Sequence, residues 1–599
     1  MRLVDPVRIG PRTLPSRVLF GPHATNSSAD RGLGDVEHYR ARAAGGAGVI
    51  VTEIASVTPD DHPYEYAPLA ATCVDGWAAV ATACASALVL AGLGHAGSQS
   101  AARGVLRAPS SVADPATRAV PRPLSLAEID LVVQAFATAA RAAVEAGCGG
   151  VEIAAGQYSL LRQFRSALST PTPDDRVLVD VLRAVREAVP EAWVGVRLCV
   201  DELAPWAGIT LAPSLGTVDR VADLVDHVVP VRGSAMSVGA TRPDAHTPSG
   251  FMTEACRAVR GVVAGRCAVV LAGSIVDPAD AQAALDDGVA DLVEMTRAQL
   301  ADPSLVSTLR AGRTPRPCVL TNQECRVRDV RNPRIGCTVE PGVVPGPIVP
   351  SDVSMAALRT AGDDEVVVVG AGPAGLEAAR TLALGGRAVR LVERDDEPGG
   401  LLRVIAGLPG RHRFARLADW YVDELARLGV SMQLGAVGPD RADVVATGAL
   451  DADRPGVSVL AVLRGTPVEG PVVVDDPLGD GAAVALAEHL APRHAVALVT
   501  PDQVAGKQLA DVVAANVRLQ RAGVDRVLEH RVVERHPDHV VVADVVTGHR
   551  HTIAGMLVDA GPRRPGAHPS AIGDALAPRT VTAAVREGRR AAEEILRAG

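Results

Sequence analysis

Residues Glu365–Arg394 read EVVVVGAGPAGLEAARTLALGGRAVRLVER, which is typical of a strand, a glycine-rich turn, a helix and a second strand. In Gly370-Ala-Gly372-Pro-Ala-Gly375 the first glycine allows a tight turn, and the second lets backbone amides approach a pyrophosphate. The third lets the helix pack against the strand. Glu393 closes the second strand, where an acid can bond a ribose hydroxyl and would repel a 2′-phosphate. The stretch therefore predicts a dinucleotide-binding domain that prefers FAD or NAD to NADP.

The first 340 residues alternate short apolar runs, typical of buried strands, with amphipathic runs typical of helices. The clearest helix spans Leu126–Ala146, because Ser125-Leu-Ala-Glu128 forms a capping box at its start. Eight strands with intervening helices predict a (β/α)8 TIM barrel, although an open doubly wound sheet also fits this pattern. The predicted strands are Arg17–Pro22, Gly48–Glu53, Ala87–Leu93, Gly150–Ala154, Trp193–Cys199, His227–Val231, Ala268–Gly273 and Asp291–Thr296.

The remainder of the chain divides into a linker and two α/β domains. Residues 341–364 are rich in proline and glycine and predict the linker. Residues 456–552 predict a further α/β domain, inserted between the two parts, 365–455 and 553–599, of the dinucleotide-binding domain. The predicted fold class is therefore α/β, with a barrel in residues 1–340 followed by a Rossmann-like domain that carries an insert.

Charge and hydropathy exclude several classes of partner. The 599 residues carry a net charge of −9, which provides no basic field for nucleic acid. No basic amphipathic helix indicates a membrane surface, and the first residues lack the layout of a signal peptide. The uncharged stretch Gly76–Ala102 fits a helix and a buried strand better than a membrane span. We expect a cytoplasmic protein in which the nine cysteines form no disulfide framework.

Residues at the carboxyl ends of the barrel strands face the active site in this fold. Arg197 ends one strand, where a cation could stabilise negative charge on a reduced flavin. Gly273, Ser274 and Arg297 follow the last two strands, where barrels build a phosphate site.

Two further features have more than one interpretation. Asp574 precedes the last helix and is either a helix cap or the acid that holds the ribityl chain of FAD. Cys318, Cys325 and Cys337 cluster after the barrel and are either buried thiols or metal ligands, although zinc and iron–sulfur sites normally need four ligands.

Together these motifs resemble the old yellow enzyme-like multidomain flavoproteins, which include 2,4-dienoyl-CoA reductase and trimethylamine dehydrogenase. Within that group the chain looks most similar to the FadH/OYE-type oxidoreductases associated with the mycofactocin redox system. The resemblance covers nearly the whole chain. It rests on RVLFGPHATN (17–26), GAGVIVTE (46–53), GGVEI (149–153), SLLRQF (159–164), VGVRL (194–198), LAGSI (271–275), MTRAQLADPSL (295–305), the cysteine segment and VVVVGAGPAGLEAA (366–379).

The resemblance implies an FMN-binding barrel, a [4Fe-4S] cluster at its edge, an FAD domain and a domain for NAD(P)H. By position it implies that Arg197 contacts the flavin ring and that Gly273, Ser274 and Arg297 bind the FMN phosphate. It assigns FAD to Gly370, Gly372, Gly375, Glu393 and Asp574, and the cluster to Cys318, Cys325 and Cys337.

The chain departs from the family pattern at several of these sites. Thr321 stands where the family has the second cysteine ligand, and a neutral hydroxyl is a poor ligand for iron. Gly92 replaces a glutamine that bonds the flavin ring. Ala154, Gln157 and Ser159 occupy the positions that supply a histidine or tyrosine to the substrate. Tyr158, one residue from the reductase tyrosine, is the candidate proton donor.

The other departures lie further along the chain. His246 is the nearest candidate for a histidine expected beyond the sixth strand. The insert opens VVVDDPLGDGAA (472–483) in place of GxGxxG, which predicts weak NAD(P)H binding there.

Two hypotheses follow from this combination. The first is an NADH:flavin oxidoreductase that passes electrons from NAD(P)H through FAD, and through a cluster if one assembles, to FMN and then to an unsaturated or quinone-like small molecule. The second is a decayed family member that serves as a flavin-binding scaffold or partner protein with little turnover.

Overall fold

The computed structural model describes residues 2–102, 104–327, 335–343, 364–439, 442–566 and 568–598. The chain forms two compact units, of which the first contains residues 1–318 and 324–336 and the second contains residues 319–323 and 337–599. Most of the predicted linker, residues 341–364, lies outside the described residues.

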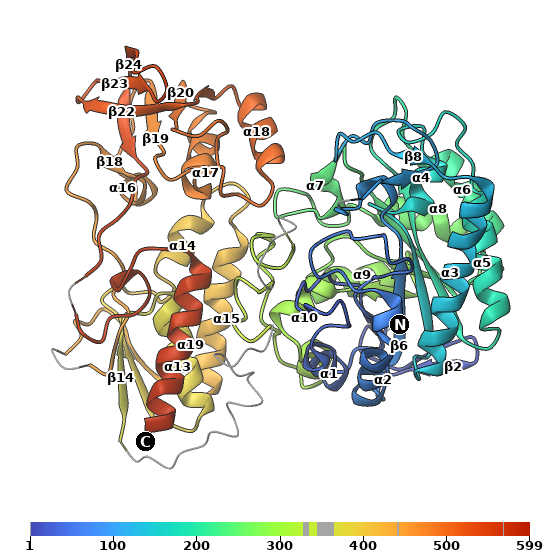
Figure 1. Ribbon diagram of the computed structural model, residues 1–599. Helices are drawn as coiled ribbons and strands as arrows, with labels where there is room; N and C mark the ends of the chain where they lie inside the picture. The colour runs from blue at the N-terminus through green and yellow to red at the C-terminus, as the bar shows by residue number, and fades with distance from the viewer. Residues whose placement is uncertain are drawn as a thin grey trace. The chain divides into compact units, whose positions relative to one another are not determined.

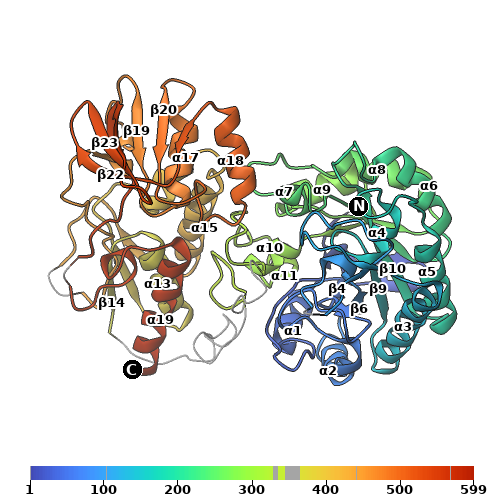
Figure 2. The same cartoon turned by 45° about the horizontal axis from the view of Figure 1, so that its top comes forward.

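A closed barrel of eight parallel strands forms the first unit, as predicted, and it excludes the open doubly wound sheet (Figures 1 and 2). The strand order is β4-β3-β13-β12-β11-β10-β9-β6, and pairing of β4 with β6 closes the ring. The strands are β3 (Val18–Phe20), β4 (Val49–Val51), β6 (Leu88–Gly94), β9 (Gly150–Ala155), β10 (Trp193–Asp201), β11 (His227–Arg232), β12 (Ala268–Leu271) and β13 (Leu292–Glu294).

Helices surround the barrel and cover the outer faces of its strands (Figures 1 and 2). The longest, α3 (Leu126–Glu145), begins with the predicted capping box, in which Ser125 and Glu128 bond each other's backbone amides. The others are α1 (Val36–Ala44), α2 (Val74–Ala83), α4 (Leu160–Arg165), α5 (Arg176–Ala188), α6 (Leu211–Val221), α7 (Val238–Thr241), α8 (Thr253–Val263), α9 (Pro278–Asp286), α10 (Thr296–Ala301) and α11 (Leu305–Arg310).

Apolar side chains fill much of the barrel interior, so it is a packed core and not a pore. The hairpin of β1 (Val7–Ile9) and β2 (Arg12–Leu14) adds Val7 and Leu14 to this core. Arg12 also donates to the carbonyl of Gly149, just before β9, which places the hairpin at the amino end of the strands. The opposite, carboxyl end is therefore the end left for a functional site.

Two parallel sheets and a small antiparallel sheet build the second unit. The first has the order β16-β15-β14-β17 and the second has the order β18-β25-β19-β20-β21. The strands of the first sheet are β14 (Val366–Val369), β15 (Val389–Val392), β16 (Ser431–Gln433) and β17 (Val444–Val445). Those of the second are β18 (Val457–Ser458), β19 (Val472–Asp475), β20 (Val496–Val499), β21 (Asp525–Val527) and β25 (Met556–Asp559).

A three-stranded antiparallel sheet follows β21, formed by β22 (His530–Arg535), β23 (His539–Asp544) and β24 (Arg550–Ala554). The helices of this unit are α13 (Pro373–Leu384), α14 (Leu401–Ala406), α15 (Arg413–Arg427), α16 (Val459–Leu463), α17 (Gly481–Leu490), α18 (Val512–Arg521) and α19 (Val581–Ala598). The last helix, α19, packs so closely along α13 that a Cβ on Gly588 would lie 2.2 Å from the carbonyl oxygen of Ala374.

Across the part of the chain that the structure describes, no helix combines the length and apolar character needed to cross a membrane. The uncharged stretch Gly76–Ala102 forms most of α2 and the buried strand β6, as expected.

Candidate functional site

A buried ion-pair system lies inside the barrel and is centred on Arg197 of β10. Its Nε donates to Oε1 of Glu152 at 2.9 Å, and its Nη2 donates to Oε2 of Glu294 at 2.5 Å. Glu152 is in β9 and Glu294 ends β13, so three strands contribute to one charged group. The two carboxylates raise the pKa of Arg197 even though burial opposes its charge, and the guanidinium stays protonated.

His227 of β11 orients Glu152 from the other side. The indole Nε1–H of Trp193 can only donate, and it lies 2.7 Å from Nδ1 of His227. His227 therefore carries its proton on Nε2, which donates to Oε2 of Glu152 at 3.0 Å. Burial opposes ionisation of Glu152, but Arg197 and His227 hold its pKa below the ordinary value, so Glu152 is a carboxylate.

One nitrogen of the Arg197 guanidinium is not used by these two carboxylates. Among the described residues, its Nη1 has no hydrogen-bond partner, while the side chain keeps 11% of its surface exposed. A cationic donor of this kind, in the middle of a barrel strand, fits the acceptor-rich pyrimidine of a flavin. The predicted ring-binding residue thus has the chemistry that the role requires.

The predicted phosphate residues lie together at the ends of β12 and β13. Gly273 has φ +100°, and Ser274 also adopts a left-handed conformation with φ +66°, which is uncommon for a serine. Arg297 donates to the hydroxyl of Ser274 and, at 3.0 Å, to the carbonyl of Pro243. A cation, a hydroxyl and an irregular turn form a donor set that fits a phosphate. Sequence analysis grouped these residues without indicating that the loop at Pro243 joins them.

Tyr158 follows β9, which ends at Ala155, so the tyrosine is in a loop and not on the strand. It has φ +62°, its side chain is partly exposed, and its hydroxyl lies 3.4 Å from Oγ1 of Thr241. Gln157 donates to the carbonyl of Arg232 at 2.5 Å. His246 lies on the loop beyond α7, where its Nδ1 is 3.0 Å from a carboxylate oxygen of Asp244.

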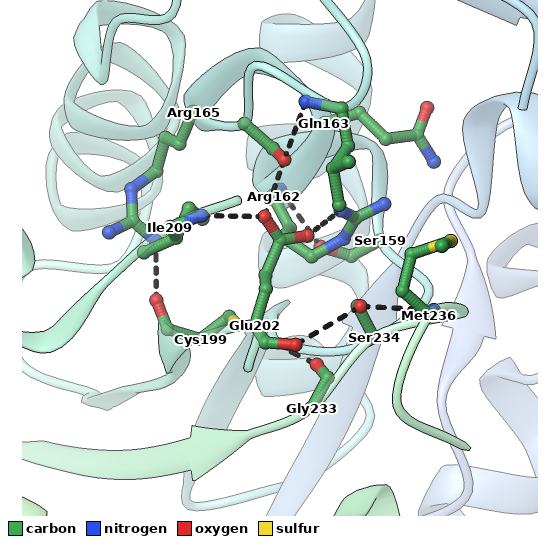
Figure 3. A network of polar contacts seen from close by, with 12 residues as sticks. Ser159, Arg162, Gln163, Arg165, Cys199, Glu202, Ile209, Gly233, Ser234 and Met236 are labelled. Atoms are coloured by element: carbon green, nitrogen blue, oxygen red, sulfur yellow. Dashed lines mark hydrogen bonds and ion pairs between the residues drawn. The ribbon is translucent and has the colours of Figure 1, made fainter. Parts of the chain in front are cut away.

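A buried polar network fixes the loops at the carboxyl end of the barrel (Figure 3). Arg162 of α4 forms an ion pair with Glu202, and Ser166 donates to the same carboxylate. Glu202 also accepts the backbone amide of Ile209 at 2.7 Å, and its carbonyl accepts the hydroxyl of Ser234. The network ties the loops after β9, β10 and β11 to one another.

Glu53, at the end of the segment GAGVIVTE, is a site residue that sequence analysis did not single out. Its carboxylate accepts the backbone amide of Thr25 at 2.7 Å and the Thr25 hydroxyl at 2.6 Å, and the hydroxyl of Tyr64 donates to it as well. Burial raises the pKa of Glu53. Its position just beyond β4, at the carboxyl end, was the available signal.

The glycine-rich turn of the second unit places its three glycines in three different environments. Gly370 has φ +101°, as the tight turn requires. A Cβ on Gly375 would lie 1.9 Å from the carbonyl oxygen of Gly370, so this position holds the helix against the turn. A Cβ on Gly372 would meet no atom within 4 Å, so the start of α13 faces open space. This arrangement fits a pyrophosphate at the helix N-terminus.

The two predicted acids lie around this turn. Oε2 of Glu393 accepts the backbone amide of Ala371, inside the turn, at 2.6 Å. Asp574 accepts the backbone amide of Arg579 at 3.0 Å, and burial raises its pKa. The residue before it, Gly573, is so close to α13 that a Cβ there would lie 2.8 Å from Cβ of Ala374. The structure therefore brings both acids to the glycine-rich turn, and this donor and acceptor set fits FAD.

In the second sheet, the corresponding turn lies between β19 and α17. Its backbone amides already donate to carboxylates of the turn itself. Oδ1 of Asp476 accepts the backbone amides of Gly479 at 2.9 Å and Asp480 at 3.3 Å. The side chain of Asp480 accepts the amides of Ala482 and Ala483 at the start of α17. These are the amides that a dinucleotide pyrophosphate would need, so the residues of this turn do not fit one.

The four positions of the predicted cluster are divided between the units. Cys318 and Cys325 belong to the first, and Thr321 and Cys337 belong to the second. Oγ1 of Thr321 lies 2.9 Å from Oγ1 of Thr338, so the hydroxyl has a protein partner. Burial raises the pKa of Cys325 to about 11, and its carbonyl contacts Nε2 of His23 at 2.7 Å. Among the described residues, no group of three or more His, Cys, Asp or Glu side chains is arranged to hold a metal ion.

The fold is a closed (β/α)8 barrel followed by a unit with a dinucleotide-type glycine-rich turn, and comparison with known sequences identifies the family. The profile of the NADH:flavin oxidoreductase / NADH oxidase family matches residues 2–315, and the chain belongs to this FMN-binding family. The profile of the NAD(P)-binding Rossmann-like domain matches residues 368–425.

The relatives share most of the chain's length. An N,N-dimethylglycine/sarcosine dehydrogenase of Chromohalobacter salexigens is 30% identical over 566 residues, covering 84% of this chain and 79% of that protein. An NADH oxidase of Thermoanaerobacter brockii is 29% identical, covering 74% and 71%.

Solved structures show the same fold. A 2-naphthoyl-CoA reductase has a TM-score of 0.89 at 21% identity over 99% of both chains. A histamine dehydrogenase from Rhizobium sp. 4-9 has a TM-score of 0.86 at 21% identity, covering 99% of this chain and 96% of that one.

Proposed function

We propose that the protein takes electrons from NAD(P)H and delivers them, through FAD in the second unit and FMN in the barrel, to an unsaturated or quinone-like small molecule. The observation that carries this proposal is the Nη1 donor that Arg197 keeps available inside the barrel, while the buried carboxylates of Glu152 and Glu294 bond its Nε and Nη2. Family membership supports flavin chemistry and a nicotinamide donor.

Bound flavins would supply the hydride and electron transfer. The chain's own contribution is to bind and orient. Arg197 offers positive charge to the ring, while Arg297 offers positive charge to the phosphate beside Ser274, whose hydroxyl donates to the carbonyl of Pro243. Reduction of a quinone does not require a side chain to protonate a carbon, so it suits a site in which Ala154 and Ser159 replace the expected histidine and tyrosine. For an unsaturated carbon substrate, Tyr158 is the candidate proton donor.

The turn at Asp476 and Asp480 bears on where the nicotinamide docks. Because these carboxylates occupy the amides at the start of α17, we place no dinucleotide in residues 456–552. Replacing Asp480 with alanine is expected to leave the KM for NADH within about twofold of wild type. A large change in that KM would place the nicotinamide at α17 after all.

No step of the proposal depends on an iron–sulfur cluster. The donor set at residues 318, 321, 325 and 337 contains three thiols and one hydroxyl, and that hydroxyl is hydrogen-bonded to Thr338. A [4Fe-4S] cluster with four cysteine ligands does not fit these residues.

A second candidate function is a flavin-binding scaffold with little turnover. Two observations favour it. Thr321 has a hydroxyl in place of a thiol, and the amides at the start of α17 are bonded by the side chain of Asp480. The first would remove the iron–sulfur cluster from the electron path, and the second would remove a nicotinamide site. Neither changes the cofactor-binding geometry at Arg197 and Gly372.

Measurements on a single protein preparation distinguish the two candidate functions. The protein is purified without oxygen, its flavins are released and identified, and NADH oxidation is followed with a dienoyl-CoA and with a quinone as acceptors. The proposal expects FMN and FAD near one each per chain, and turnover with at least one acceptor. Flavin without turnover would support the scaffold, absence of FMN would overturn the oxidoreductase proposal, and absence of both flavins would overturn both. N,N-dimethylglycine is tested as an electron donor, because its oxidation would reverse the proposed direction.

A further inference from the structure

Arg197 has one more counter-ion than its charge requires. Glu152 alone would neutralise the guanidinium, and His227 already orients that carboxylate. Glu294 adds a second carboxylate 2.5 Å from Nη2. One positive and two negative groups therefore share a largely buried space, in which the side chains of Arg197, Glu152 and Glu294 are 11%, 2% and 15% exposed.

The backbone fixes the position of Glu294. The residue ends β13, which pairs with β3 and β12, so its Cα cannot shift without disturbing the barrel. Its carboxylate packs against Gly21, where a Cβ would lie 2.4 Å from Cδ of Glu294. Oε1 of Glu294 accepts the hydroxyl of Thr296 at 3.3 Å, and that hydroxyl accepts the amide of Gly21 at 2.9 Å. The strand pairing, the packing against Gly21 and the hydrogen bond from Thr296 thus direct the carboxylate toward Arg197.

We propose that Glu294 is a positioning residue that shares the Arg197 guanidinium with Glu152 and lowers the reduction potential of the flavin bound at Arg197. The inference rests on the proposed function, because it requires FMN in the barrel. Reduction places negative charge on the flavin pyrimidine, and a cation beside it favours the reduced form. A second carboxylate on that cation opposes this effect, and the opposition is strong where water is largely excluded.

The orientation of Arg197 follows from the same contacts. Glu152 holds Nε and Glu294 holds Nη2, which leaves Nη1 as the donor available to a ligand. Glu294 therefore acts on the flavin in two ways, by directing which nitrogen faces it and by reducing the net positive charge that the nitrogen presents.

The test compares wild type with Glu294→Gln, which keeps the shape and one acceptor but removes the charge, and with Glu294→Ala, which removes both. Glu145→Gln, on the exposed end of α3, is the matched control for a lost carboxylate in the same unit. Two readouts are used, the equilibrium reduction of the FMN against a dye of known potential and the dissociation constant for sulfite, an anion that adds to electron-poor flavins.

In Glu294→Gln the reduction equilibrium is expected to shift about tenfold or more toward reduced flavin, or roughly 30 mV for a two-electron couple. Sulfite is expected to bind about tenfold more tightly, while Glu145→Gln leaves both values unchanged. Unchanged potential and sulfite affinity in both Glu294 variants, with FMN still bound, would overturn this inference alone. Wild-type protein that binds no FMN would overturn the proposed function as well, so the two failures are distinguishable.

Discussion

Nε2 of His227 lies 3.0 Å from Oε2 of Glu152, and Trp193 determines that this nitrogen carries the proton. The pair joins β11 to β9 inside the barrel, and through Arg197 it continues to β10 and β13. Four of the eight barrel strands are thus connected by one buried polar chain. Such a chain stabilises the fold only while every member has its partner, because an unpartnered buried polar group is costly.

His227→Ala is therefore expected to lower the free energy of unfolding by about 2–4 kcal/mol, since it leaves the Trp193 indole and Glu152 each short of a partner and creates a cavity. Trp193→Phe removes only the indole N–H that donates to His227, so it should lower the free energy of unfolding by less, about 1–3 kcal/mol. Urea denaturation followed by circular dichroism measures both. The control is His549→Ala on an exposed turn, and a loss of similar size there would contradict the role of the buried chain.

The glycine-rich turn allows cofactor binding to be separated from folding. Gly372→Ala is expected to leave the melting temperature nearly unchanged, because its Cβ meets no atom, but to remove bound FAD by occupying the space at the start of α13. Gly375→Ala should instead destabilise the unit, because its Cβ would lie 1.9 Å from the Gly370 carbonyl oxygen. Flavin release and thermal unfolding distinguish the two, and retention of FAD by folded Gly372→Ala would show that the cofactor does not approach this turn.

The sequence was sufficient to predict the barrel and the glycine-rich turn, because both depend on local patterns. Alternating apolar runs locate the eight strands, and Gly370, Gly372 and Gly375 are close neighbours whose spacing alone defines the turn. The same reasoning placed Arg197 at the end of its strand, whereas β10 continues to Asp201 and Arg197 is its middle residue.

The partners of Arg197 could not be predicted in this way. Glu294 is 97 residues from Arg197 in the sequence, and His227 is 75 residues from Glu152. Their contact depends on strand register and on which face of each strand turns inward, and strand boundaries read from sequence are too uncertain to fix either. Asp476 and Asp480 were noticed only as a departure from GxGxxG, because their capture of backbone amides requires the geometry of the turn.

Thr321 offers a direct test of whether its hydroxyl limits iron binding. Thr321→Cys is expected to raise the iron content of protein purified without oxygen, because it supplies the thiolate that the donor set lacks. Thr338→Val, which removes the hydrogen bond to Thr321 without adding a thiol, is the control and should leave iron unchanged. Iron near four per chain in wild type would show instead that three cysteines are enough.

The buried Asp476 gives the second unit a defined pH dependence. Burial, reinforced by the Asp480 carboxylate, raises the pKa of Asp476 to about 7, whereas in the unfolded chain it is about 4. Between these values the folded protein binds a proton that the unfolded chain has released, so the contribution of Asp476 to stability falls as pH rises from about 4 to about 7 and is constant above that.

Asp476→Asn removes this titration and keeps an oxygen for the amides of Gly479 and Asp480. The variant is therefore expected to gain stability relative to wild type as pH rises, reaching on the order of 1–4 kcal/mol by pH 8. Urea unfolding at pH 5, 6, 7 and 8 measures the difference, with Asp525→Asn on the exposed surface as the control. A difference that stays constant across this range would mean that Asp476 is already ionised at pH 5 in the folded protein.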